Sequence, residues 1–298
     1  MNYTNRYNLP TYLADWIKTD KYDYNYEPNT ISATTLLKPV RAHIISGRHA
    51  GELQIDVSEL IASKYGNAIH DSVERIDTPG VQKEQRTTRK IDIDGAEYTV
   101  TGKYDILVEE NGVHTLRDMK STSVWSFIYG GKDDDYRHQL SIYRWLLSQD
   151  KNVNPVAYID FFFTDWQSVK ARTEQGYPGQ RIQAGYKIDL LSLEDTEALI
   201  RAKLTVLQNF RDTPDDQLPL CSKEELWAEE DTFAVYKIGN KRATKVFDNK
   251  IEAVAFKDSK KLGFVQDRPG KVKRCGYCSA RPWCNQFEQL KKEGLIAE

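Results

Sequence analysis

The sequence predicts an α/β protein of the α+β kind, in which helices flank a central β-sheet and a cysteine-bearing region follows. Three observations support this fold class. Residues 89–120 alternate as strands do, helical patterns precede and follow them, and all four cysteines lie beyond residue 220. A chain of 298 residues, 40% apolar and 29% charged, is long enough to bury a sizeable core.

The region before the strands is predicted to hold two helices after an irregular start. Its first 30 residues, rich in Tyr, Asn and Asp, indicate an irregular arm. A short helix should follow and end near Pro39, because proline interrupts helical hydrogen bonding. Residues 56–76 combine a Ser/Glu start signal with apolar residues at helical spacing, which predicts a longer helix.

The strands should form two hairpins. Asp94-Gly95 and Asn111-Gly112 interrupt a stretch rich in β-branched and aromatic residues, and both dipeptides are strong two-residue turn signals. Further elements are predicted as a helix over 136–148, a strand over 156–166 and a helix over 192–212. The expected segments are an N-terminal arm and helix (1–55), a core (56–215) and a C-terminal four-cysteine region (216–298).

The second hairpin would bring like charges together. If Asn111-Gly112 is a two-residue turn, counting back along both strands places Asp105 opposite Asp118, and the lysines at 103 and 120 opposite each other, on one face. Like charges about 5 Å apart at Cβ destabilise a sheet. A hard divalent cation between the two carboxylates would remedy this, since Mg²⁺ and Mn²⁺ prefer carboxylate oxygens. The alternative is that this face is simply solvated.

Two further pairs share helix faces. His70 and Glu74 are four residues apart on the predicted helix before the hairpins, and Gln139 and Tyr143 have the same spacing on the helix after them. Taken alone, a histidine is more often a packing or surface residue than a ligand, and the Gln/Tyr pair is more often packing. Their order along the chain is more informative than either pair.

That order resembles the PD-(D/E)XK nuclease superfamily, and within it the RecB-like branch with the CRISPR-adaptation and AddB-type nucleases. The pattern is a helical His, then G-x-x-D, D-x-K and Q-x3-Y, over roughly residues 60 to 165. The resemblance implies a restriction-endonuclease-like core with a central mixed β-sheet, and it is compatible with a phage-encoded protein. One departure is that Tyr104, not Pro, precedes Asp105.

The resemblance also implies a metal-dependent deoxyribonuclease. The ligands of Mg²⁺ or Mn²⁺ would be His70, Asp105, Asp118 and the backbone carbonyl of Met119. Such ions lower the pKa of a bound water and neutralise phosphate charge. We expect phosphodiester hydrolysis, with exonuclease action the favoured hypothesis, in DNA recombination, repair or phage DNA processing.

Other residues take supporting roles in this interpretation. Lys120 would orient the attacking water or stabilise developing charge. Gln139 and Tyr143 would contact the substrate strand or support the site, and Glu74 would hold the second ring nitrogen of His70. The alternatives are a non-catalytic nucleic-acid-binding module of the same fold, or an unrelated enzyme with a structural zinc tail.

The cysteines form a second signal, independent of the carboxylates. Cys275, Cys278 and Cys284 are spaced C-x2-C-x5-C, and Cys221 completes a set of four. Four thiolates suit zinc or an iron–sulfur cluster, whereas ordinary buried thiols are a weaker explanation. The spacing resembles the [4Fe–4S] motif of AddB-type and CRISPR-adaptation nucleases. In those families the remote cysteine precedes the core, whereas here it follows, which keeps Zn²⁺ open as an alternative.

Charge and hydropathy bear on the expected binding partner and on the expected location of the protein. The formal net charge is −2, but basic segments are local, and aromatic residues between 125 and 136 precede the Gln139 helix. Basic groups with aromatic rings suit single-stranded DNA or duplex ends, although charged runs can also be plain solvated faces. The N-terminal residues have no apolar h-region, and no later stretch is a candidate membrane span, so we expect a cytoplasmic protein in a bacterial or phage-infected cell.

Overall fold

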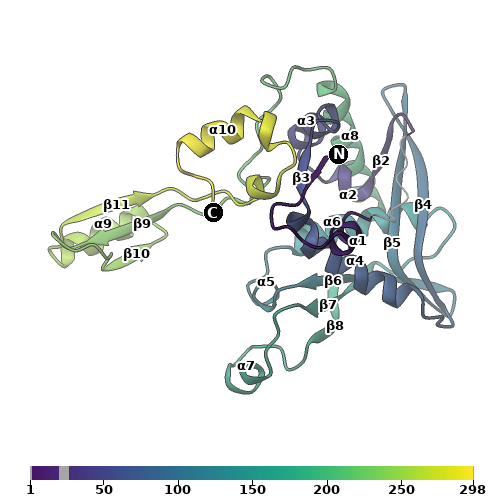
Figure 1. Ribbon diagram of the computed structural model, residues 1–298, viewed down its shortest axis with the longest axis horizontal. Helices are drawn as coiled ribbons and strands as arrows, with labels where there is room; N and C mark the ends of the chain where they lie inside the picture. Colours follow the sequence, from purple (N-terminus) through teal and green to yellow (C-terminus); the bar gives the residue numbers. More distant parts are fainter. Residues whose placement is uncertain (1, 20–26, 298) are drawn as a thin grey trace. The chain divides into compact units, whose positions relative to one another are not determined.

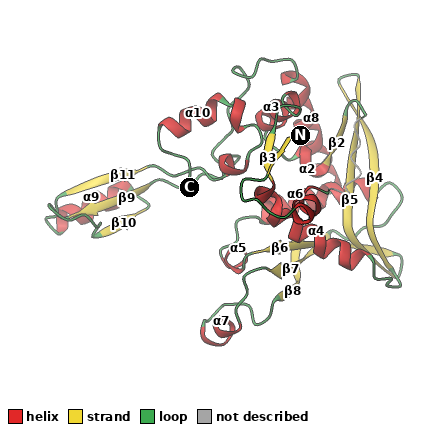
Figure 2. Ribbon diagram, viewed as in Figure 1, coloured by secondary structure: helices red, strands yellow, loops and turns green. Residues whose placement is uncertain are grey.

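The computed structural model describes residues 2–19 and 27–297 (Figures 1 and 2). The chain forms two compact units. The first comprises Met1–Leu37 with Gly51–Asn209, and the second Lys38–Ala50 with Phe210–Glu298. The expected segments 1–55, 56–215 and 216–298 remain a prediction, because compactness reports packing and not which piece folds by itself.

A six-stranded sheet forms the centre of the first unit. Its strands are β2 (Thr30–Ser32), β4 (Val81–Ile93), β5 (Ala96–Glu110), β6 (Val113–Thr122), β7 (Val156–Phe163) and β8 (Ile182–Asp189). The order is β2-β5-β6-β7-β8, with β4 also paired to β5. The β2–β5 and β6–β7 pairs are parallel and the others antiparallel, which confirms the predicted mixed sheet.

Both predicted hairpin turns are present. The φ angles are 49° and 83° at Asp94 and Gly95, and 52° and 76° at Asn111 and Gly112. Positive φ at both central residues is the geometry that matches the twist of the flanking strands. The β5–β6 ladder pairs Glu110 with Val113 and continues in that register to Ile106 opposite Arg117.

Strand β5 divides one of its edges between two neighbours. Along this divided edge, residues 99–101 pair with β2 and residues 106–110 pair with β6. The other edge of β5 pairs with β4 along almost its whole length. Within the described chain, residues 102–105 have no ladder partner on the divided edge. We call this opening the fork. It contains Asp105, so the ladder ends one position short of the predicted Asp105–Asp118 pair.

Helices pack around the sheet. They are α1 (Thr11–Lys18), α2 (Ala33–Leu36), α4 (Ile61–Glu74), α5 (Val124–Ile128), α6 (Asp133–Leu147), α7 (Ser168–Thr173) and α8 (Leu193–Phe210). α6 buries Trp145 and Leu146 in the main core. A Cβ at Gly102 would lie 2.8 Å from the side chains of Tyr143 and Leu146. The glycine of the G-x-x-D motif is therefore required by the close approach of α6 to β5.

The N-terminal region is more regular than expected. β1 (Asn2–Thr4) pairs in parallel with β3 (Gln54–Asp56), and α1 follows β1, so the irregular arm is wrong for residues 2–4 and 11–18. Residues 5–10 are irregular as expected, and residues 20–26 lie outside the described chain. Asp56 fixes this pairing by accepting hydrogen bonds from Thr4 Oγ1 at 2.8 Å and from the Arg6 N–H at 2.9 Å. Each bond joins residues that are 50 or more positions apart in the sequence, and local sequence patterns do not reveal such contacts.

The second unit contains a small antiparallel sheet. The helices and strands of this unit are α3 (Val40–Arg48), β9 (Thr232–Tyr236), β10 (Lys245–Phe247), α9 (Lys250–Ser259), β11 (Phe264–Arg268) and α10 (Asn285–Lys292). The strand order is β10-β9-β11, and α9 packs on it. Pro39 separates α2 from α3 and occupies the N-cap of α3, so the helix expected to end there is followed directly by another. Among the described helices, none is long and apolar enough to cross a membrane.

Candidate functional site

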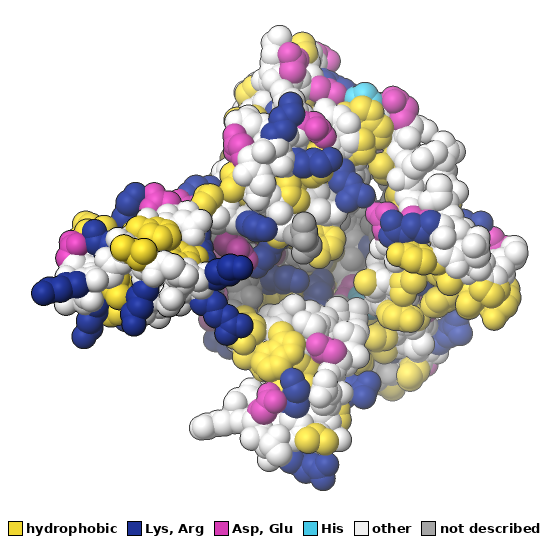
Figure 3. All heavy atoms as spheres, turned by 60° about the vertical axis from the view of Figure 1, so that its left-hand side comes forward, with side chains coloured by type: hydrophobic (Ala, Val, Ile, Leu, Met, Phe, Trp, Pro, Cys, Tyr) yellow, Lys and Arg dark blue, Asp and Glu magenta, His cyan; other side chains and the backbone are white. Residues whose placement is uncertain are grey.

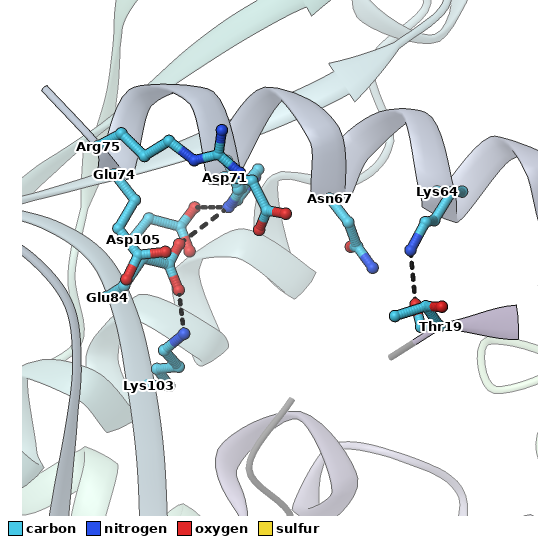
Figure 4. Close-up of a pocket in the computed structure, with 10 residues that line it drawn as sticks. Thr19, Lys64, Asn67, Asp71, Glu74, Arg75, Glu84, Lys103 and Asp105 are labelled. Atoms are coloured by element: carbon cyan, nitrogen blue, oxygen red, sulfur yellow. Dashed lines mark hydrogen bonds and ion pairs between the residues drawn. The ribbon is translucent and has the colours of Figure 1, made fainter. Parts of the chain in front are cut away.

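A polar cavity of about 440 Å³ lies in the first unit between α4, β4 and β5 (Figure 4). Lys64, Asn67, Asp71, Glu74 and Arg75 line it from α4, and Thr19 closes one end. His70 also lines it from α4, Glu84 from β4, and Lys103 and Asp105 from β5. The cavity therefore combines basic, acidic and imidazole groups, as a site for an ionic ligand would.

His70 connects the helix to the fork. Its Nδ1 lies 3.2 Å from Glu84 Oε1 and 3.6 Å from Asp105 Oδ2, and its Nε2 lies 3.1 Å from the carbonyl oxygen of Met119. Burial alone would lower the pKa of His70, but the Glu84 hydrogen bond and the Asp105 charge raise it. Glu74 lines the same cavity, but the described partner of His70 is Glu84.

Glu84 is the residue that the sequence analysis missed. β4 pairs Lys83 with Ile106 and Gln85 with Tyr104, so Glu84 lies opposite Asp105. A positive φ of 51° at Glu84 accompanies a break in the ladder at this position. Counting from the Asp94-Gly95 turn, as was done for the second hairpin, would have found it. Lys103 holds the other carboxylate oxygen of Glu84 at 2.7 Å.

Asp105 lies in the fork and accepts a hydrogen bond from the backbone N–H of Met119 at 2.8 Å. Its carboxylate thus replaces a ladder bond where β5 and β6 separate. Burial, followed by the charge of Asp118, raises the pKa of Asp105 to about 7. The electrostatic conflict predicted between these two carboxylates is therefore present, although the ladder ends before them.

Asp118 and Lys120 form an ion pair beside the cavity. The Asp118 side chain is 2% exposed, and Lys120 Nζ lies 2.7 Å from its Oδ2. Among the described residues, Asp118 Oδ1 has no hydrogen-bond partner. Burial would lower the pKa of Lys120, but the charges of Asp118 and Asp105 raise it and keep the ammonium protonated. Neither residue is among those that line the cavity.

Three side chains are arranged to hold a cation. One ligand atom each of His70, Glu84 and Asp105 lies within 4.8 Å of the other two. Imidazole nitrogen with carboxylate oxygens is a donor set that Mg²⁺ or Mn²⁺ accepts. A cation here would also relieve the repulsion that raises the Asp105 pKa. Of the predicted ligands, His70, Asp105 and the Met119 carbonyl are brought together, while Asp118 faces Lys120.

Gln139 and Tyr143 lie on α6, which packs against β5. Gln139 Nε2 donates to Tyr143 Oη at 3.1 Å, and Tyr143 is 5% exposed against Gly102. Because Asp105 follows Gly102 by three residues, this contact fixes the strand that carries the carboxylate. Aromatic residues nearby divide in two: Trp125 and Tyr129 stack in the open with Tyr129 80% exposed, whereas Phe127 packs on Phe161.

All four cysteines line one cavity in the second unit. Burial, followed by neighbouring charges, raises the pKa of Cys221 to about 12 and that of Cys275 to about 11. Without a metal ion these thiols would be protonated at neutral pH.

A buried arginine adjoins the cysteines. Arg41 of α3 is 1% exposed, and its Nε donates to Cys284 Sγ at 3.3 Å. Its other donors bind the carbonyl oxygens of Leu218 and Asp215 and the side chain of Asn285. These acceptors are neutral, so the guanidinium has no carboxylate partner among the described residues. Burying a cation is costly unless an anion accompanies it.

Comparison with known proteins places these features. Residues 79–285 match the sequence profile of the PD-(D/E)XK nuclease superfamily. A search of curated protein sequences finds no match. Among solved structures, "Crystal structure of SSO0001" aligns at 20% identity with a TM-score of 0.45, covering 64% of this chain and 81% of that one. Because the profile spans more than half of the sequence, the chain belongs to the PD-(D/E)XK nuclease superfamily.

Proposed function

We propose that this protein is a metal-dependent deoxyribonuclease whose active site is the cavity at the fork. The observation that carries the proposal is the convergence of His70, Glu84 and Asp105 within 4.8 Å, beside the Asp118–Lys120 ion pair. Superfamily membership supports nuclease chemistry and a nucleic-acid substrate. Mg²⁺ or Mn²⁺ is the proposed ion, since the donor atoms are oxygen and imidazole nitrogen.

The side chains then have distinct roles. His70, Glu84 and Asp105 would hold the cation, with Asp118 and the Met119 carbonyl available to it from β6. When bound, the ion would lower the pKa of a water and screen the phosphate. Lys120, kept protonated by Asp118, would place its ammonium beside the charge that develops on the phosphate. Gln139 and Tyr143 are positioning residues, since they act through Gly102 and β5.

The finer assignment is to the RecB-like branch, with exonuclease action on single strands or duplex ends. The ordered motif set from His70 to Tyr143 supports the branch. The exposed Trp125–Tyr129 stack, with Lys170 Nζ 4.7 Å from the Trp125 ring, supports contact with unpaired bases. DNA recombination, repair or phage DNA processing is the setting that such an activity would serve.

For the cysteines we propose a [4Fe–4S] cluster, with Zn²⁺ the alternative. Two features support a metal-bound tetrathiolate. Arg41 is buried beside Cys284 and needs an anionic partner, and all four cysteines line one cavity. The C-x2-C-x5-C spacing of Cys275, Cys278 and Cys284 favours the cluster. Cys221 would be the fourth ligand. It precedes the small sheet in the sequence, whereas the other three cysteines follow it.

Cleavage of end-labelled DNA tests the nuclease proposal. Single-stranded and duplex substrates are incubated with Mg²⁺, Mn²⁺ or EDTA, alongside covalently closed circular DNA. The proposal predicts metal-dependent products from linear DNA, none in EDTA and none from circles. Cutting of circles would contradict exonuclease action. Uncut DNA with either metal, using protein shown to be folded, would contradict nuclease function and favour the non-catalytic binding module.

Metal content tests the cysteine proposal separately. Protein purified without oxygen should be brown, absorb broadly near roughly 400 nm and contain about four irons per chain. A colourless protein with about one zinc per chain would replace the cluster by the zinc alternative. Ready alkylation of Cys221 in folded, metal-free protein would contradict both.

A further inference from the structure

The small sheet of the second unit carries a concentrated positive charge. Residues 232–268, which contain β9, β10, α9 and β11, hold nine Lys and Arg but four Asp and Glu. Their net charge is therefore +5, against −2 for the whole chain, so the remainder is −7. In Figure 3 this part, at the left, shows Lys and Arg side chains around a hydrophobic patch. A reversal of sign within one chain indicates a local electrostatic function.

Topology gathers much of this charge at one end of the sheet. Residues 237–244 connect β9 to β10, and residues 260–263 connect α9 to β11, at the same end. The two loops touch, because a Cβ at Gly263 would lie 2.8 Å from the Ile238 side chain. We call these loops, with Phe264, the basic tip. The loops contain no acidic residue, and their basic residues are Lys237, Lys241, Arg242, Lys260 and Lys261.

These cations are unneutralised. All five are exposed, and no ion pair to them is present among the described residues. Two of the four acidic residues in 232–268 are engaged elsewhere: Asp267 pairs with Lys250 at 2.6 Å, and Asp258 with Lys257 at 3.0 Å. Lysines after a helix do favour its negative C-terminal end. That explanation covers residues 260 and 261 after α9, but not 237, 241 and 242 on the other loop.

The basic tip also exposes apolar surface. Ile238 is 87% exposed, and Phe264 is 50% exposed while stacking on Tyr236 with ring centroids 5.1 Å apart. Pairing places Tyr236 and Phe264 together on one face, and Phe247 contacts α9 from the opposite face, so α9 does not cover the aromatic pair. An open aromatic ring surrounded by unpaired cations is the surface that binds unpaired nucleotides.

We infer that the basic tip is a second nucleic-acid contact, outside the catalytic cavity, that binds single-stranded DNA through its phosphates and stacks one base on Phe264. The inference extends the proposed function by giving the substrate a second attachment. Single-stranded DNA is favoured over duplex because the exposed ring needs an unpaired base face. It is favoured over an anionic membrane because the chain belongs to a nuclease superfamily.

Fluorescence anisotropy in EDTA tests this without cleavage, using the full chain and a labelled 20-nucleotide oligo(dT) or the matching duplex. The variant Lys241→Gln/Arg242→Gln/Lys260→Gln/Lys261→Gln should bind oligo(dT) about tenfold or more weakly at 0.1 M salt. Its plot of log affinity against log salt should be shallower by about 0.7 for each lost phosphate contact. Phe264→Leu, which keeps apolar packing on Tyr236, should lose about fivefold on oligo(dT) but little on duplex.

The matched control is Lys223→Gln/Lys292→Gln, two exposed lysines of the same unit outside the basic tip, and it should bind as wild type. Restoring charge with Lys→Arg and Arg→Lys at the four tip positions should restore binding, which separates charge loss from misfolding. Unchanged binding by the quadruple Gln variant would overturn the inference. Tighter binding of duplex than of oligo(dT), or tip-dependent binding to vesicles of anionic phospholipid without any effect on DNA, would also overturn it.

The outcome is separable from that of the proposed function. If the quadruple Gln variant binds normally while wild type cleaves DNA with Mg²⁺, the basic tip fails and the nuclease stands. If wild type never cleaves DNA but binds oligo(dT), and the quadruple Gln variant loses that binding, the nuclease proposal fails and the basic-tip inference stands. An Asp118→Asn variant should retain tip-dependent binding in either case, because its substitution lies in the first unit.

Discussion

The two candidate metal sites are built in opposite ways. The cavity site is assembled by two adjacent hairpins and one helix, with all of its ligands between residues 70 and 119. In the cysteine centre, Arg41 contacts Cys284, which lies 243 residues later in the sequence. Cys221, which precedes the small sheet in the sequence, lines the same cavity. At the cavity the Asp105 carboxyl lies near a second carboxylate, Asp118, whereas the cysteine centre holds a buried guanidinium with no carboxylate partner among the described residues. Local strand geometry thus defines the proposed chemistry, and long-range contacts define the proposed structural centre.

The largest difference should appear on removing one cysteine. Cys278→Ser should destabilise the protein by more than about 4 kcal/mol, because a structural metal supplies its binding free energy to folding. Thermal unfolding and metal content measure this, with the exposed neighbour change Ser279→Ala as control. A variant with wild-type stability and no bound metal would show that the centre does not support the fold.

Removing a catalytic group should act first on the cleavage rate. Lys120→Ala should lower the cleavage rate by about 100- to 1000-fold, since its ammonium would stabilise developing charge. The metal-free protein should also melt at a lower temperature, because the Asp118 carboxylate, 2% exposed, loses its ion-pair partner. Single-turnover rates on end-labelled DNA are the measurement. Wild-type cleavage by this variant would refute the role given to Lys120.

The carboxylate conflict should be visible as a pH dependence of metal-free stability. The folded protein raises the Asp105 pKa from 3.8 to about 7, so the folded state binds this proton more tightly than the unfolded state. Stability from this group is therefore present below pH 4 and is lost as pH rises toward 7. Asp105→Asn should abolish the loss and be more stable than wild type at pH 8 by roughly 2–4 kcal/mol.

Urea unfolding in EDTA at pH 5 and pH 8 measures this difference. Asn keeps a side-chain oxygen that can accept the Met119 N–H, so packing is preserved. Equal stability of both proteins at both pH values would mean that Asp105 is already ionised without strain.

The smallest expected effect distinguishes two glutamates on the same cavity. Glu84→Gln should weaken Mn²⁺ binding by about tenfold, because Glu84 orients His70 and offers an oxygen to the ion. Glu74→Gln is the matched control, since it lines the cavity without a described bond to His70. Metal dependence of cleavage gives both values. Equal losses in the two variants would return the supporting role to Glu74.

The success and failure of sequence analysis follow the same division. The hairpin turns and the β5–β6 register were predictable because Asp-Gly and Asn-Gly fix a two-residue turn. The fork was not, since it depends on β2 pairing with β5 from far upstream. Glu84 was within reach of the first hairpin's register, but a charged residue in a charged strand has no distinguishing pattern.

Long-range contacts explain the remaining differences. The grouping of the cysteines followed from their spacing, whereas Arg41 could not be connected with them because it precedes the first of them, Cys221, by 180 residues. The N-terminal strand and helix were obscured by a polar composition, and depend on Asp56 for their anchoring bonds. Spacing predicts chemistry within a segment, and packing between distant segments needs the folded structure.

Calorimetric titration of metal-stripped protein with Mn²⁺ tests the central claim most directly. The account predicts binding at the cavity that Asp105→Asn abolishes and that Cys278→Ser, where folded, leaves in place. Binding at pH 6 should also release a proton, because Asp105 is largely protonated there in the metal-free state. Unchanged Mn²⁺ binding by Asp105→Asn, with no proton release in wild type, would contradict a metal site at the fork.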